Sequence, residues 1–185
     1  MAAEHQDNTT TLWQLVRPIT SQDVAREKIL LKNGAPSMDG ISFRLVRSIP
    51  NSCLSKMFNL WLLAGYLPLC LKQHRMVLIP KVDDPKSASE FCPIMISSFL
   101  MRLHHKIIAR WCSSAFELHP AQRAFKKGDV CAENVMLLDA ILRDATQNLQ
   151  PLLLGVLDVS KAFDSVNHGA VLRVTTRMGA PPPLL

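Results

Sequence analysis

The sequence predicts an α+β fold, because stretches with helical periodicity alternate with short apolar segments that have the character of strands. Of the 185 residues, 48% are hydrophobic and 19% are charged, which is the balance of a chain that folds around a core rather than of a disordered one. A chain of this length is expected to form one domain or a part of a larger one.

The first part of the chain is predicted to be mainly helical. Residues 21–32 carry apolar side chains at helical spacing, with Ser21 as the cap, and the Gly and Pro of residues 33–36 end this helix. Residues 41–49 form a second, short helix. Residues 51–64 form a third helix, whose buried face is made of Leu54, Met57, Phe58 and Trp61.

A β-hairpin is predicted next. Residues 75–81 read as a strand, and the turn-forming residues of the loop 82–90 lead to a second apolar segment, residues 91–96. The two segments are expected to pair antiparallel, and Pro93 places the second at an edge, because proline cannot donate to a ladder.

The remainder returns to helix, apart from one apolar segment. Ser97 or Ser98 caps a long helix that runs to about residue 117, and residues 132–145 form another. Residues 152–157 are predicted to be a buried strand, and residues 162–178 a final helix. Asp158 stands where that strand ends, so its carboxylate can leave the core and reach a metal ion.

The charge distribution favours a polyanionic partner, although only weakly. The net charge is +6, and Arg102, Lys106 and Arg110 recur every four residues, which places them in one stripe along a helix. Such a stripe can follow a phosphate backbone, and the alternative is an ordinary solvated helix face. A second basic cluster, in a predicted loop, consists of Arg123, Lys126 and Lys127.

Several classes of protein are disfavoured by what the sequence lacks. Its five cysteines are odd in number and have no Cys-x-x-Cys spacing, so a zinc site or a disulfide framework is not expected, and the thiols are predicted to be reduced and mostly buried. No phosphate-binding glycine loop is present. Reduced thiols, together with the lack of a secretory core and of a membrane-length apolar run, predict an intracellular protein, nuclear or cytoplasmic. The adjacent His104 and His105 point in different directions on a helix and are predicted to be two partly exposed side chains.

Residues 157–168, Leu-Asp-Val-Ser-Lys-Ala-Phe-Asp-Ser-Val-Asn-His, resemble the first catalytic motif of reverse transcriptases from non-LTR (LINE-type) retrotransposons. Other elements of the same family occur in the family's order and spacing, and they cover the chain from about residue 34 onward. The subtype that the motifs resemble is the one that inserts into ribosomal DNA. The matching elements are Gly34-Ala35-Pro36-Ser37-Met38-Asp39-Gly40-Ile41, Val77-Leu78-Ile79-Pro80-Lys81, Phe91-Cys92-Pro93-Ile94, and Gln122-Arg123-Ala124-Phe125 with Glu133-Asn134.

The resemblance implies the helix-rich fingers and a partial palm of a right-hand polymerase fold, with residues 1–20 as a flexible leader and 21–185 as a partial reverse transcriptase domain. It implies an RNA template, a DNA primer and Mg²⁺. Asp158 would be the first catalytic carboxylate and a metal ligand, together with the Val159 carbonyl. Nucleotide contacts would come from the fingers lysine and from the backbone after the catalytic strand: Lys81, Ala162 and Phe163. The alternative for Lys81 is a solvated lysine at a strand end.

Three departures from the family pattern bear on activity. Cys92 stands where the family has a phosphate-binding arginine, and a thiol cannot replace a charged, forked guanidinium. Ser37 stands where the family usually has glycine. The second catalytic element, an x-Asp-Asp hairpin, is not found after Asp158. The sequence therefore predicts a truncated reverse transcriptase domain that is inactive by itself, and the alternative is a non-catalytic RNA-binding or interaction protein derived from a retrotransposon remnant.

Overall fold

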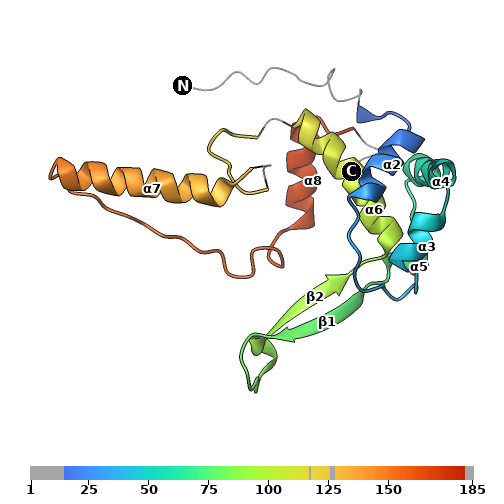
Figure 1. The fold of residues 1–185 in the computed structure, drawn as a ribbon, viewed down its shortest axis with the longest axis horizontal. Helices are drawn as coiled ribbons and strands as arrows, with labels where there is room; N and C mark the ends of the chain where they lie inside the picture. Colours follow the sequence, from blue (N-terminus) through green and yellow to red (C-terminus); the bar gives the residue numbers. More distant parts are fainter. Residues whose placement is uncertain (1–14, 117, 126–127, 182–185) are drawn as a thin grey trace. The chain divides into compact units, whose positions relative to one another are not determined.

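The computed structural model describes residues 15–116, 118–125 and 128–181. These residues form two compact units. The first unit contains the described residues up to 116 together with those from 172 onward, and the second contains the described residues from 118 to 171. The predicted α+β class is confirmed, because the described residues combine helices with a small antiparallel sheet (Figure 1).

The helices of the first unit closely follow the predicted ones. The third, α4 (Asn51–Ala64), has the predicted bounds, and α6 (Phe99–Ala115) begins after Ser98, whose side chain accepts from the Leu100 N–H. The cap of α2 (Ser21–Ile29) is Thr20 instead of Ser21. Thr20 and Asp23 satisfy each other's backbone N–H groups in a capping box, so the cap lies one residue earlier than predicted, and α2 ends at Ile29 instead of residue 32. The remaining helices are α3 (Phe43–Ser48) and α5 (Leu69–Lys72), of which the sequence did not indicate α5.

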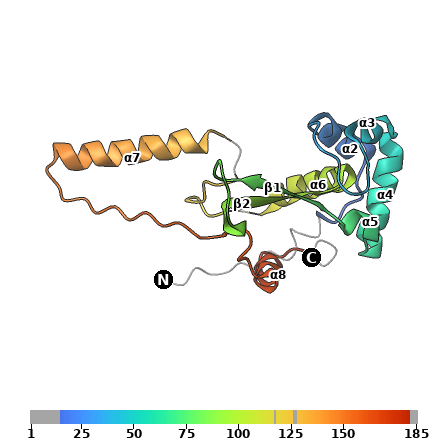
Figure 2. The ribbon, with the colours of Figure 1, turned by 90° about the horizontal axis from the view of Figure 1, so that it is seen from below.

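The core of the first unit surrounds α6. Its side chains Phe99, Leu103 and Ile107 are fully buried, because they recur on one face at helical spacing. Helices α2 and α3 pack against α6, and α2 also packs against α4 (Figure 2). These helices contribute Val24, Val46, Leu54 and Phe58 to the same core cluster.

The segment before α2 belongs to this core as well. Leu15 and Ile19 are buried, although both lie within the predicted flexible leader. The backbone of Ile19 is held by Asn59 of α4: its N–H donates to Asn59 Oδ1 over 2.7 Å, and its carbonyl accepts from Asn59 Nδ2 over 2.9 Å. Residues 1–14 of the leader lie outside the described residues.

The predicted hairpin is confirmed. Strand β1 (Arg75–Pro80) pairs antiparallel with β2 (Phe91–Ile96), and Leu78 stands opposite Pro93. The connection contains a short 3₁₀ turn, η2 (Ala88–Glu90), whose capping box joins Ser87 and Glu90. Most side chains of both strands are exposed, so the hairpin extends from the helices of its unit with little cover (Figure 1).

The second unit contains one long helix, α7 (Val130–Gln147), which extends the prediction at both ends. Asp129 caps it by accepting from the Ala132 N–H. In the described part of the chain, no helix combines the length and the apolar character that crossing a membrane requires.

The predicted strand over residues 152–157 is wrong. These residues have no regular secondary structure and form no ladder with any other described segment, and their side chains are exposed. An apolar run becomes a strand only when another backbone accepts and donates its hydrogen bonds, so the apolar pattern was not sufficient.

The final helix begins later than predicted. Residues 160–165 form turns in which Lys161 has a left-handed φ of 50° and its carbonyl accepts from the Ser165 N–H over 2.9 Å. Helix α8 (His168–Arg177) starts only after Asn167, whose side chain accepts from the Ala170 N–H. Asparagine is a strong helix cap, which explains why the helix begins at this position.

Candidate nucleic-acid interface

The predicted basic stripe exists on α6, but its side chains are hydrogen-bonded to other parts of the first unit. Lys106 Nζ donates to the Leu30 carbonyl over 3.0 Å, and Arg102 Nη2 donates to the Ala35 carbonyl over 2.8 Å. Arg102 also lies over the Phe99 ring, 4.2 Å from its centroid. These interactions hold the chain that follows α2 against α6, so the stripe has a structural role that the sequence did not indicate.

Arg110 is bound to a carboxylate. Its Nε donates to Oε1 of Glu27, which is buried on α2. A buried carboxylate needs a cationic partner, and Arg110 serves as that partner for Glu27. The carboxylate in turn offsets the positive charge of Arg110. Of the three predicted residues, Arg110 therefore has the least charge to offer to a phosphate.

A groove between the end of α2 and α6 is lined by the other two residues of the stripe, Arg102 and Lys106, and by Lys32. It has a volume of about 520 Å³, and we call it the α2–α6 groove. No acidic residue is among the residues that line it, and apolar side chains form part of its surface. Its lining residues are Leu30, Leu31, Lys32, Asn33, Arg102, His105, Lys106 and Ala109. Cations on a surface without acidic residues can bind the phosphate backbone of a nucleic acid.

Lys32 is a groove residue that the sequence analysis missed. It lies at the end of the predicted first helix, where its charge gave no periodic signal, and only the fold brings it to the stripe on α6. His105 also lines the groove, and burial lowers its pKa, with a smaller contribution from His74.

The prediction that both histidines are partly exposed is wrong for His104. Only 7% of His104 is exposed, and its ring lies 5.2 Å from that of Phe58 and 5.5 Å from that of Trp61. Burial lowers its pKa to about 4, and the neighbouring His105 adds to this effect. His104 is therefore a neutral core residue near pH 7, since α6 turns it toward α4.

The second basic cluster is only partly described. Arg123 Nη1 forms an ion pair with Glu133 Oε2 of α7 at 2.9 Å. This ion pair connects the two parts of one family motif, residues 122–125 and residues 133–134. Lys126 and Lys127 lie outside the described residues.

The residues that the resemblance assigns to polymerase fingers lie on the hairpin and beside it. Lys81 is exposed directly after β1, and its Nζ donates to the Ser89 carbonyl over 3.0 Å. Cys92 stands opposite Ile79 and is exposed, so its thiol occupies a surface position. Ser37 is buried and its hydroxyl lies 2.8 Å from the Ile96 carbonyl, a hydrogen bond to β2 that glycine could not make.

The prediction that the thiols are mostly buried is wrong. Cys112 is half-buried, whereas the other four are exposed: Cys53, Cys70, Cys92 and Cys131. All five are free thiols in the structure. The exposed ones lie on solvent-facing positions of helices and of β2, so the usual tendency of cysteine to be buried did not hold here.

The Asp158 segment belongs to the second unit. Asp158, Val159 and Ala162 are exposed, and Phe163 is exposed except where its ring approaches that of Phe125, at 6.4 Å between centroids. Among the described residues, no three acidic, histidine or cysteine side chains are grouped to hold a metal ion. Because Mg²⁺ needs several oxygen ligands in an octahedron, the described residues do not fit a complete Mg²⁺ site.

The described residues form an α+β fold with a groove that is lined by cations and by no acidic residue. No protein-family model matches the sequence. Comparison with known proteins gives 34% identity over 163 residues to the Pol polyprotein of the type-2 retrotransposable element R2DM from Drosophila melanogaster, covering 88% of this chain and 15% of that protein. The type-1 element R2 polyproteins of Popillia japonica and Nasonia vitripennis are 36% and 34% identical, covering 86% and 95% of this chain.

The chain is therefore a homologue of one segment of the Pol polyproteins of R2 retrotransposable elements. The retrotransposon origin predicted from the motifs is confirmed. The chain spans 15%, 23% and 17% of the lengths of these three relatives.

Proposed function

We propose that this chain forms the fingers and the first catalytic segment of an RNA-directed DNA polymerase encoded by a retrotransposon. The observation that supports this best is the hairpin, because β1 and β2 pair the two fingers motifs with each other in register. The relatives are named as Pol polyproteins, and the aligned segments cover most of this chain. The proposed nucleic-acid partners are an RNA template and a DNA primer.

Within this proposal, Asp158 supplies one catalytic carboxylate, and its exposure leaves the carboxylate accessible. Lys81 contacts the incoming nucleotide or the template, and Phe163 packs near the sugar. The Val159 carbonyl is a second ligand of the metal ion, and the Ala162 backbone contacts the nucleotide, as the family motif implies. Among the described residues, no three Asp, Glu, His or Cys side chains are grouped to hold a metal ion, so we propose that the chain alone does not polymerise DNA.

The polymerase role can be tested in a chimera in which this chain replaces the aligned segment of the Popillia japonica R2 polyprotein. We expect RNA-templated primer extension by the chimera, and Asp158→Ala should reduce it about a hundredfold. Loss of groups that merely support a metal ligand already costs roughly 10–100-fold, so loss of a ligand belongs at the upper end of that range. Extension of a labelled DNA primer is the measurement.

Asp164→Ala is the matched control, because Asp164 belongs to the same motif as Asp158 and is also exposed. Its effect should stay within about threefold. Equal activity of the Asp158→Ala chimera and the unsubstituted chimera would contradict the catalytic role. For the chain alone, primer extension that depends on Asp158 would contradict the proposal that it is inactive by itself.

A second candidate function is RNA binding without catalysis, and the α2–α6 groove favours it. Its positive side chains have no acidic neighbour among the lining residues. Lys106 donates one hydrogen bond to the Leu30 carbonyl and keeps two further N–H groups for a phosphate.

We expect the double variant Lys32→Gln/Lys106→Gln to bind single-stranded RNA several-fold more weakly than the unsubstituted chain. The dependence of log K on log salt should become shallower by about 1 for each lysine that no longer neutralises a phosphate. Fluorescence anisotropy of a labelled RNA at several salt concentrations measures both effects. Lys56→Gln, an exposed lysine of α4 outside the groove lining, is the control, and an equal loss in this variant would argue against the groove.

A further inference from the structure

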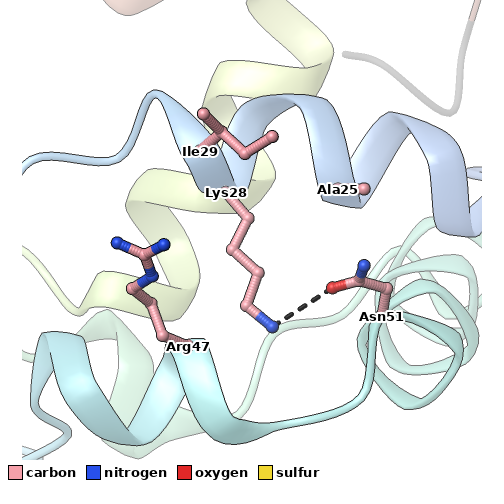
Figure 3. A pocket seen from close by; sticks show the side chains of 5 residues that line it. All are labelled: Ala25, Lys28, Ile29, Arg47 and Asn51. Atoms are coloured by element: carbon pink, nitrogen blue, oxygen red, sulfur yellow. Dashed lines mark hydrogen bonds between the residues drawn. The ribbon is translucent and has the colours of Figure 1, made fainter.

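A second pocket of the first unit lies between α2, α3 and α4, and it is lined by different residues from the α2–α6 groove. Its volume is about 280 Å³, and we call it the Lys28 pocket. The residues that line it are Ala25, Lys28, Ile29, Arg47 and Asn51 (Figure 3). Two of these five side chains are cations and none is an acid.

Lys28 is the unusual member, because only 9% of it is exposed and yet no carboxylate faces its ammonium group among the described residues. Figure 3 shows its side chain extending from α2 toward Asn51 at the start of α4. Its Nζ donates to the Ile49 carbonyl over 2.6 Å and to Asn51 Oδ1 over 3.1 Å. An ammonium group has three N–H donors, so one is left over.

Arg47 adds a second charge from α3. Its guanidinium is exposed and lies 5.4 Å from the centroid of the Phe43 ring, and no ion pair within the described residues includes it. Burial lowers the pKa of Lys28, and the charge of Arg47 lowers it further, so the two cations act on each other. An anion in the pocket would remove this repulsion.

The rest of α2 shows how this chain usually treats a buried charge. Asp23 is paired with Arg17 at 3.0 Å, and Glu27 is paired with Arg110. Lys28 alone among these three buried charges of α2 has no charged partner among the described residues. The adjacent first turn of α4 also contains no acidic residue, and its cap, Pro50, offers no side-chain acceptor. The pocket therefore contains positive charge that no acidic side chain in its lining offsets, and an anion would be bound favourably there.

We propose that the Lys28 pocket binds a phosphate group, held by the remaining Lys28 N–H and by the forked guanidinium of Arg47. The volume is several times the roughly 30 Å³ that a water molecule occupies in the liquid, so a phosphate group fits. Arginine binds phosphate oxygens through two parallel hydrogen bonds, and lysine binds them as a point charge. The phosphate can belong to a nucleic-acid strand or to a free phosphate compound, since the chemistry of recognition is the same.

The test is a titration of the full chain with inorganic phosphate against sodium chloride of equal ionic strength, followed by two-dimensional ¹H–¹⁵N NMR. We expect saturable shifts at the backbone amides of Lys28, Arg47 and Asn51 with phosphate and none with chloride. Arg47→Gln should weaken phosphate binding about tenfold, since a hydrogen bond to a charged group contributes on the order of 1.5–3 kcal/mol. Arg44→Gln removes an equal charge from the same short helix, does not touch the pocket lining, and should change affinity less than about twofold.

Backbone-amide shifts that do not saturate with phosphate would overturn the proposal. An equal loss of phosphate affinity in the Arg47→Gln and Arg44→Gln variants would overturn it as well. Arg47 is exposed, so its substitution is expected to leave the fold intact, and the unchanged remainder of the spectrum verifies this. A ten-nucleotide RNA that displaces phosphate from the pocket would identify a nucleic-acid strand as the source, and binding of phosphate without displacement by RNA would identify a free phosphate compound. The measurement needs no polymerase activity, so it stands apart from the proposed function.

Discussion

Phe58→Ala is expected to lower the free energy of unfolding of the first unit by about 4 kcal/mol, which is in the usual range for removing a buried aromatic ring. Phe58 is fully buried on α4. Its ring lies 5.1 Å from that of Trp61 and 5.2 Å from that of His104, so it fills the space between α4 and α6. Its loss would leave a cavity that these rigid neighbours cannot close. Urea denaturation followed by tryptophan fluorescence measures the change.

Leu63→Ala provides the control for this substitution. Leu63 lies on the same helix but points to solvent, so its truncation should change the free energy of unfolding by less than about 0.5 kcal/mol. A loss at Phe58 no larger than the loss at Leu63 would show that the packing of α4 against α6 does not stabilise the unit.

The sequence predicted the local elements of the first unit well, because their signals are local. The bounds of α4 follow from its periodic apolar residues and from Gly65, which takes the left-handed conformation that ends the helix. The hairpin follows from two apolar segments around a loop of turn-forming residues, and both strands were found where the pattern placed them.

The use of the basic residues on α6 was not predictable from the same pattern. A spacing of four shows that Arg102, Lys106 and Arg110 share one helix face, but it does not show what that face meets. Their partners lie 67, 76 and 83 residues away in the sequence, at Ala35, Leu30 and Glu27 respectively. The same limit applies to Lys32, which reaches the α2–α6 groove only through the packing of α2 against α6.

The misplaced strand at residues 152–157 has a related cause. Apolar content indicates that a segment is suited to burial, whereas a strand also needs a second backbone in register. In the described residues that backbone is not found, and Leu153 and Val156 are almost fully exposed. The position of Asp158 after an apolar run is a property of the sequence. Its catalytic role is a proposal that rests on the family motif and that the chimera experiment tests.

His104 is expected to make the first unit less stable in acid. Its two ring nitrogens make no hydrogen bond within the described residues, and aromatic rings surround it. Protonation would bury a charge that nothing offsets, which is why the pKa falls from 6.5 to about 4 in the folded chain. The unfolded chain therefore binds the proton more readily than the folded one.

It follows that the contribution of His104 to stability is fully present above pH 6.5, is lost as the pH falls from 6.5 to about 4, and is constant below that. The total loss is about 3 kcal/mol.

His104→Leu keeps an apolar side chain in the core and cannot titrate, so at pH 7 it should be as stable as the unsubstituted chain or slightly more stable. Near pH 4 it should be more stable by about 3 kcal/mol. Urea denaturation of both proteins between pH 7 and pH 4 measures the difference, in which the effects of other titrating groups such as Asp23 largely cancel. Parallel pH profiles for the two proteins would show that His104 is protonated as readily in the folded chain as in the unfolded one, and hence that it is not enclosed between α4 and α6.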